Sequence, residues 1–149
     1  MILWRISKHS TLDGRGGMFS SARWHTQGRP IVYLAESPAG AVLEALVHLE
    51  LSLDAYPTHY GLLKTEAPDG VSVRTLQAGD LSPHWFRDVI VTRSIGDEWL
   101  ISRSTLLLRV PSAIVPETSN VLLNPKHPDA RQIRILRHEE YPWDARLLI

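Results

Sequence analysis

The chain has 149 residues, 44% of them apolar, and its 16 basic and 16 acidic side chains give a formal net charge of zero. This length suits one folded domain with a sizeable core, and the apolar content with five tryptophans excludes a disordered tail. Cysteine is absent, which excludes disulfides and thiolate metal sites, and the sequence has neither a long apolar run nor a signal-peptide pattern. We therefore expect a cytoplasmic protein without a membrane span.

The first third of the chain predicts two short strands and one well-marked helix. Residues 2–6 and 30–35 are rich in the β-branched and aromatic types that strands prefer. Ser37 is a good N-cap and Pro38 suits the first helical turn, so we predict a helix at about 38–51. Its apolar side is expected to consist of Leu43, Leu46, Val47 and Leu49.

The remainder of the chain alternates predicted strands with one helical region. The helical region spans 85–104, in one short piece before Thr92 and a second around 96–101. Further strands are predicted at 58–66, 71–75, 106–113, 120–125 and 133–136. Together the elements predict a single domain, residues 1–149, of the α+β class, with a strand-rich core and one early helix.

Charge is spread unevenly along the chain. The first 35 residues carry five basic side chains against Asp13 alone, whereas the charged side chains of residues 36–69 are six acidic groups against Lys64 alone. A protein that binds nucleic acid over a broad surface is usually basic overall, so we do not expect nucleic acid as a direct partner. A compact anion site fits the N-terminal cluster better. The basic residues are Arg5, Lys8, Arg15, Arg23 and Arg29.

Three side chains in consecutive elements form the candidate site. Arg23 lies in a loop, Tyr33 in the following strand and Glu44 in the following helix. Consecutive elements usually lie beside one another, so the three can converge on one pocket. A fixed cation, an aromatic ring with a hydroxyl and a carboxylate suit a ligand with phosphates, a flat ring and a sugar, such as a dinucleotide.

Each of these residues also has a purely structural interpretation. Glu44 is flanked by the small Ala41 and Ala45, which leaves open volume beside the carboxylate, but it could equally be a surface glutamate paired with His48. Tyr33 lies in an apolar strand, where a tyrosine is often part of the core.

Arg23 precedes Trp24, so a structural cation–π contact is the alternative to ligand binding. Other catalytic patterns find little support, because the chain has no nucleophile elbow, no P-loop and no Gly-x-Gly-x-x-Gly sequence. The histidines lack zinc-ligand spacing, so no metal is expected.

Taken together, these segments resemble the RES family, the toxin half of bacterial RES–Xre toxin–antitoxin pairs. The resemblance is carried by residues 3–6, 23–35, 37–49, 108–116 and 120–128, in matching order and spacing, whereas residues 52–98 match only loosely. It implies a fold related to ADP-ribosyltransferases and a reaction that uses NAD⁺ as substrate.

The resemblance also implies the residues that do the chemistry. The family's arginine, tyrosine and glutamate correspond to Arg23, Tyr33 and Glu44, and its serine corresponds to Ser112; Arg5 is a further candidate phosphate contact. Family members either deplete NAD⁺ by cleaving its nicotinamide–ribose bond or use NAD⁺ to ADP-ribosylate a protein. Two other readings remain, a module that binds a nucleotide without reacting and a toxin that cleaves nucleic acid.

The implied partner is an Xre-type helix-turn-helix antitoxin that covers the pocket. We also expect the chain to form a homo-oligomer, a dimer within the complex, because exposed tryptophans such as Trp85 or Trp143 would suit an interface.

Overall fold

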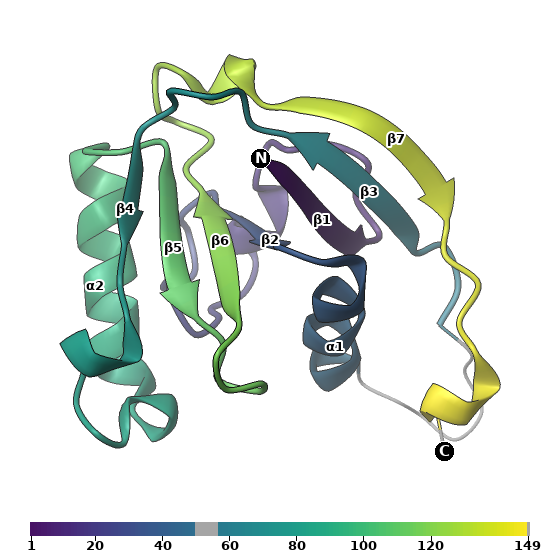
Figure 1. The fold of residues 1–149 in the computed structure, drawn as a ribbon, viewed down its shortest axis with the longest axis horizontal. Helices are drawn as coiled ribbons and strands as arrows, with labels where there is room; N and C mark the ends of the chain where they lie inside the picture. Colours follow the sequence, from purple (N-terminus) through teal and green to yellow (C-terminus); the bar gives the residue numbers. More distant parts are fainter. Residues whose placement is uncertain (50–56, 149) are drawn as a thin grey trace.

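One mixed sheet forms the centre of the computed structural model, which describes residues 1–49 and 57–148 (Figure 1). The strands follow the spatial order β4-β5-β6-β2-β1-β3-β7. In this part of the chain β4 and β5 are parallel, and every other neighbouring pair is antiparallel. The strands are β1 (Ile2–Ser7), β2 (Val32–Ala35), β3 (Gly61–Glu66), β4 (Val73–Thr75), β5 (Leu107–Pro111), β6 (Ser119–Leu123) and β7 (Arg134–Glu140).

Two helices, α1 (Pro38–His48) and α2 (Val89–Ser102), pack on the same face of the sheet. Directly opposed residues of antiparallel strands point to one face. Tyr33 of β2 opposes Leu122 of β6, which packs with Trp99 of α2. Ala35 lies two residues after Tyr33 in β2 and therefore points to the same face, where it packs with Ala41 of α1. Figure 1 shows α2 beside β4 and β5, and α1 farther along beside β1 and β2.

The other face of the sheet is covered mainly by loops. Fully buried Leu3, Val32, Leu107 and Val121 form its core, and residues of the connecting segments pack over them. Side chains along the strands thus alternate between two apolar faces, and the two helices cover different parts of one of them, α2 near β4 and β5 and α1 near β1 and β2 (Figure 1).

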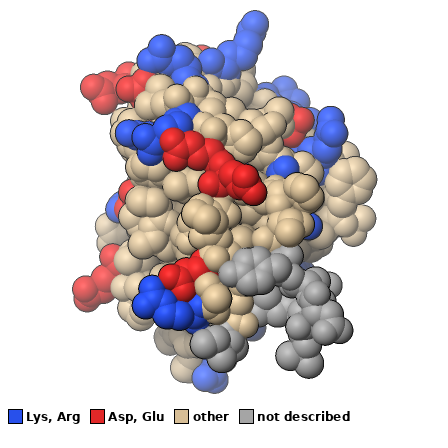
Figure 2. All heavy atoms as spheres, turned by 90° about the vertical axis from the view of Figure 1, so that its right-hand side faces the viewer, with Lys and Arg blue, Asp and Glu red and all other residues tan. Residues whose placement is uncertain are grey.

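The outer strand β7 is exposed along its whole length and carries charges of both signs. Arg134 pairs with Glu66 and Arg137 with Glu139. Figure 2 shows basic and acidic groups interspersed on this side of the molecule. Charged side chains on an edge strand discourage pairing with other chains, so this edge is protected from aggregation.

The predicted α+β class and strand-rich core are confirmed, and the differences are in element boundaries. The early helix begins at Pro38, where the Ser37 hydroxyl accepts a hydrogen bond from the Gly40 amide, as predicted. It ends at His48 rather than at about 51, because Leu49 is extended; residues 50 and 51 lie outside the described residues.

The predicted apolar side of the early helix is wrong for two residues. Leu43 is 38% exposed and Val47 is 56% exposed, whereas Leu46 and Leu49 pack in the cluster beneath α1. The contact with the sheet centres instead on Ala41, whose small side chain allows the helix to approach β1 and β2 closely.

The two-piece helix predicted at 85–104 is also corrected. A 3₁₀ turn, η3 (Trp85–Arg87), precedes one continuous helix that runs through Thr92. Asp88 caps this helix, since its carboxylate accepts a hydrogen bond from the Val91 amide. None of the helices in residues 1–49 and 57–148 is long and apolar enough to cross a membrane.

The expectation of exposed tryptophans is wrong. Trp85 and Trp143 are each only 6% exposed. Trp85 packs against Trp24, and Trp143 stacks edge-on with Tyr60. Large aromatic rings gain most when buried in a core, so neither tryptophan supports the expected self-association.

The close approach of α2 to the preceding loop generates a stability prediction. A Cβ at Gly96 would overlap the Trp24 carbonyl oxygen, which is rigid main chain. We expect Gly96→Ala to lower the free energy of unfolding by about 1–3 kcal/mol, despite the higher helix propensity of alanine. Chemical denaturation measures the change. The matched control is Gly79→Ala, where a Cβ meets nothing within 4 Å; equal stabilities of the two variants would contradict this packing.

Candidate active site

A cavity of about 750 Å³ opens between α1, β1, β2 and the loop before β2. Arg5, Arg23, Tyr33 and Glu44 all contribute to its lining, so the structure brings together four of the five predicted site residues. Glu44 is the one acidic side chain among the described lining residues, which also include the basic Lys8 and Arg93. A concave site with this charge balance attracts anions.

Glu44 has one oxygen fixed by two donors. Its Oε1 accepts a hydrogen bond from Ser112 Oγ at 3.0 Å and another from Asn120 Nδ2 at 2.6 Å. Among the described residues no hydrogen bond reaches Oε2. The carboxylate is therefore oriented, with its second oxygen available to a ligand. This geometry replaces the surface pairing with His48 that the sequence left open.

Asn120 reaches Glu44 because of the strand register. β6 pairs with β2 so that Asn120 opposes Ala35, and Ala35 packs against α1. The amide therefore lies on the helix-bearing face, below Glu44. A polar residue just before the apolar run 121–123 was the available signal, but its role depends on a hydrogen bond to Glu44, 76 positions away in the sequence.

The hydroxyl of Ser112 donates to Glu44 and also accepts two hydrogen bonds. Its oxygen accepts hydrogen bonds from the Ile114 and Val115 amides, both at 3.1 Å, while its proton goes to Glu44. The side chain is buried, with 8% exposure. The structure thus places Ser112 behind the carboxylate, where it orients Glu44.

Tyr33 presents its ring to the cavity and directs its hydroxyl into the protein. The hydroxyl oxygen accepts a hydrogen bond from the Trp24 amide at 3.2 Å and lies 2.8 Å from His25 Nδ1. Burial raises the pKa of this phenol well above its usual range. The hydroxyl is therefore neutral and already occupied, and the ring is the part of Tyr33 that can contact a ligand.

The hydrogen bonds of His25 to Tyr33 and Ser20 require one particular tautomer of its ring. Its Nε2 lies 2.9 Å from the Ser20 carbonyl oxygen, which can only accept, so Nε2 carries the proton. Nδ1 then accepts the Tyr33 proton. Burial lowers the pKa of His25 below its ordinary value of 6.5, which favours the neutral ring that this arrangement requires.

Arg23 is held beside the cavity by the 3₁₀ turn before α2. Its Nη1 donates to the Phe86 carbonyl at 2.9 Å, and its guanidinium lies 5.9 Å from the Trp85 ring centroid. The predicted structural alternative named the wrong ring, since the cation–π partner is Trp85 rather than Trp24. The remaining guanidinium donors can face a ligand in the cavity.

The other basic residues of the N-terminal cluster divide into two groups. Arg5 and Lys8 line the cavity, and burial lowers the pKa of Arg5 to about 10, so its guanidinium stays charged at neutral pH. Arg15 pairs with Asp13, and Arg29 with Asp97, so these two serve local structure. The basic part of the cavity lining thus includes only some members of the N-terminal cluster.

Sequence reasoning missed three contributors, Asn120, His25 and Arg93. Arg93 lines the cavity and donates from Nε to the Ala22 carbonyl at 2.7 Å. It lies in the stretch where the family resemblance is loose, and no local pattern marked it. His25 lies two residues after Arg23 in the sequence, but only the fold reveals its partner, Tyr33.

Comparison with known proteins identifies relatives over nearly the whole chain. The RES domain family matches residues 2–144. A protein named Toxin Res from Pseudomonas putida is 50% identical over 147 residues, covering 99% of both chains. The Prs ADP-ribosylating toxin of a Sphingobium species is 37% identical and covers 97% of this chain and 95% of its own.

A solved structure shares the fold at low sequence identity. The match is to the crystal structure of the M. tuberculosis MbcT–MbcA toxin–antitoxin complex, with a TM-score of 0.70 and 16% identity. It covers 94% of this chain and 83% of the other. The likeness supports the α+β assignment and is consistent with the ADP-ribosyltransferase-like fold that the sequence resemblance implies.

The buried His25 generates a pH prediction. Its lowered pKa means that the unfolded chain binds a proton more readily, so stability is complete above about pH 6.5 and falls as the pH drops through the folded-state pKa. His25→Asn keeps an acceptor near Tyr33 and should flatten this decline in the free energy of unfolding. Exposed His84, substituted as His84→Asn, is the control and should keep the wild-type slope. Parallel slopes for all three proteins would contradict the buried neutral imidazole.

Proposed function

The chain belongs to the RES domain family, and we propose from this premise that it is a toxin that cleaves NAD⁺ at the nicotinamide–ribose bond. The names of its relatives support the toxin role, and the mixed charge of the cavity supports the substrate. The observation that carries the proposal is the oriented carboxylate of Glu44, which has one oxygen held by Ser112 and Asn120.

The carboxylate matches the charge that develops during this cleavage. The carbon–nitrogen bond breaks with its electron pair going to nicotinamide, and the ribose becomes oxocarbenium-like. A carboxylate fixed nearby stabilises that positive charge without having to reorganise. Oε2 of Glu44 can also accept a hydrogen bond from a ribose hydroxyl, which would orient the sugar.

The remaining lining residues suit the other parts of a dinucleotide. Arg23 offers a planar cation for the pyrophosphate, and the face of Tyr33 offers a surface for the nicotinamide ring. The leaving group is neutral once it departs, so the step needs no general acid. This agrees with a lining in which Glu44 is the one carboxylate of the described residues.

The acceptor of the ribosyl group separates two versions of the proposal. Transfer to water or phosphate depletes NAD⁺, whereas transfer to a protein side chain makes the chain an ADP-ribosyltransferase. The second version draws support from the 37% identical relative named as an ADP-ribosylating toxin. Both versions break the same bond and use the same carboxylate.

A toxin of this kind requires a restraint, and we propose an Xre-type helix-turn-helix antitoxin in the cytoplasm. The fold match to a toxin from a toxin–antitoxin complex supports a partner of this general kind. Val47 and Ile114 line the cavity and are 56% and 37% exposed, so apolar surface for a covering segment lies at its edge. We take residues 1–149 as one RES domain that dimerises within that complex.

The sharpest variant is Glu44→Gln, because glutamine keeps an oxygen for Ser112 and Asn120 and removes the charge. Turnover of NAD⁺ should fall by at least about a hundredfold, since the variant loses charge stabilisation in the transition state. Induced in a bacterium, the wild-type chain should stop growth as cellular NAD⁺ falls, and the variant should do neither. The control is Glu98→Gln, an exposed glutamate on α2, which should behave as wild type.

Melting temperatures must agree between wild type and Glu44→Gln for the loss to be assigned to chemistry. Growth arrest with steady NAD⁺ would contradict depletion, and labelled protein from labelled NAD⁺ would then favour transfer. We expect the antitoxin to be encoded next to this chain, and co-expression of that neighbouring gene should restore growth and give a co-eluting complex whose mass reports the dimer. A neighbour that does neither would count against the toxin–antitoxin assignment.

A further inference from the structure

We propose that Thr92 of α2 is a positioning residue for Arg23, and that α2 presets this arginine for substrate binding; the proposal rests on the proposed function. Thr92 lies outside the lining of the cavity and is 0% exposed. Its influence on a ligand is therefore indirect, and its shortest hydrogen bond leads to Arg23.

The hydroxyl of Thr92 donates its shortest hydrogen bond to an acceptor outside its own helix. Within a helix, threonine commonly bonds to a carbonyl three or four residues earlier. Here those distances are 3.3 Å to Val89 O and 3.5 Å to Asp88 O, whereas Arg23 O lies at 2.6 Å. The single proton therefore goes across to Arg23. A buried hydroxyl needs a partner, and here that partner is the main chain of a site residue.

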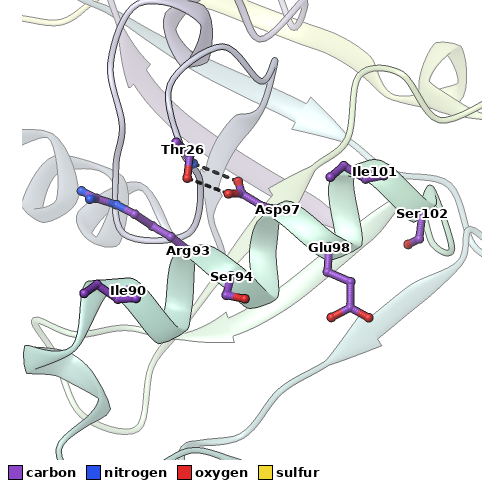
Figure 3. Close-up of a pocket in the computed structure, with 8 residues that line it drawn as sticks. All are labelled: Thr26, Ile90, Arg93, Ser94, Asp97, Glu98, Ile101 and Ser102. Carbon is purple, nitrogen blue, oxygen red and sulfur yellow. Dashed lines mark hydrogen bonds between the residues drawn. The ribbon is translucent and has the colours of Figure 1, made fainter.

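Further contacts fasten the same segment along α2. Arg93 Nε donates to the Ala22 carbonyl at 2.7 Å, and Asp97 accepts hydrogen bonds from the amide and hydroxyl of Thr26 at 2.9 and 2.6 Å. Figure 3 shows Asp97 directed at Thr26, while Glu98 points away from this segment. Residues 22–26 are thus held on both sides of Arg23.

The side chain of Arg23 is held by the same region of the fold. Its guanidinium donates to Phe86 O and lies over Trp85, and both residues belong to the turn that leads into α2. Main chain and side chain are therefore fixed by one continuous stretch, η3 with α2. An arginine fixed in advance loses less conformational freedom when it grips phosphate, so binding is strengthened without any new contact.

The proposed role predicts an effect on substrate affinity rather than on the chemical step. Thr92→Val keeps the shape and removes the donor, which leaves the part-buried Arg23 O without this partner and frees the segment. We expect the KM for NAD⁺ to rise by about tenfold with a smaller change in kcat, as follows from losing one hydrogen bond that orders the segment. Thr92→Ser restores the donor and should bring KM back to within about twofold of wild type.

The matched control is Thr65→Val. Thr65 is also 0% exposed and also donates to a distant main-chain oxygen, Leu3 O at 3.0 Å, but neither residue lines the cavity. It should lose similar stability with KM unchanged. If Thr92→Val does not fold, Thr92→Ala removes the donor without placing a methyl group against the carbonyl, and the same rise in KM is expected.

The outcomes separate this proposal from the proposed function. Wild-type cleavage of NAD⁺ together with an unchanged KM in the folded Thr92 variant, or with an equal rise in Thr65→Val, overturns the positioning role alone. If wild type binds NAD⁺ without cleaving it, the proposed reaction fails, and calorimetric Kd values for the same variants decide the positioning role. Wild type that neither binds nor cleaves NAD⁺ overturns both.

Discussion

The carboxylate of Glu44, held by Ser112 and Asn120, is the constraint around which the site is arranged. To place these three groups within hydrogen-bonding distance, α1 must lie against β2, and β6 must pair with β2 in one register. A slip of one residue would turn Asn120 to the opposite face of the sheet. The small Ala41 at the helix contact and the turn that buries Ser112 serve the same geometry.

The cationic wall of the cavity is built from a different part of the sheet. α2 packs on β5 and β6 through Trp99 and fastens the segment that carries Arg23. The Glu44 carboxylate enters the cavity from α1, whereas the guanidinium groups of Arg23 and Arg93 come from the loop before β2 and from α2. Tyr33 contributes its ring from β2, and its hydroxyl is tied to His25. In the proposed reaction, the carboxylate that stabilises the transition state and the arginine that binds phosphate therefore belong to different elements.

Local sequence signals were enough for the start of the early helix, and they singled out Arg23, Tyr33 and Glu44, which the fold brings to one cavity. Ser37 and Pro38 mark the helix start through capping chemistry that depends only on neighbours. The small residues beside Glu44 indicated open volume, and the cavity lies there. Asn120 could not be assigned a role, because strand register is a long-range property. The burial of Trp85 and Trp143 also depends on tertiary packing, so composition alone led to the wrong expectation of exposed rings.

The most direct test of the central claim is the release of free nicotinamide from NAD⁺ by the purified chain, followed by proton NMR. A carboxylate oriented toward the ribose predicts nicotinamide accumulating with repeated turnover, together with an ADP-ribosyl product whose identity reveals the acceptor. NAD⁺ that binds the chain and remains intact through prolonged incubation would contradict the account and leave a nucleotide-binding module in its place.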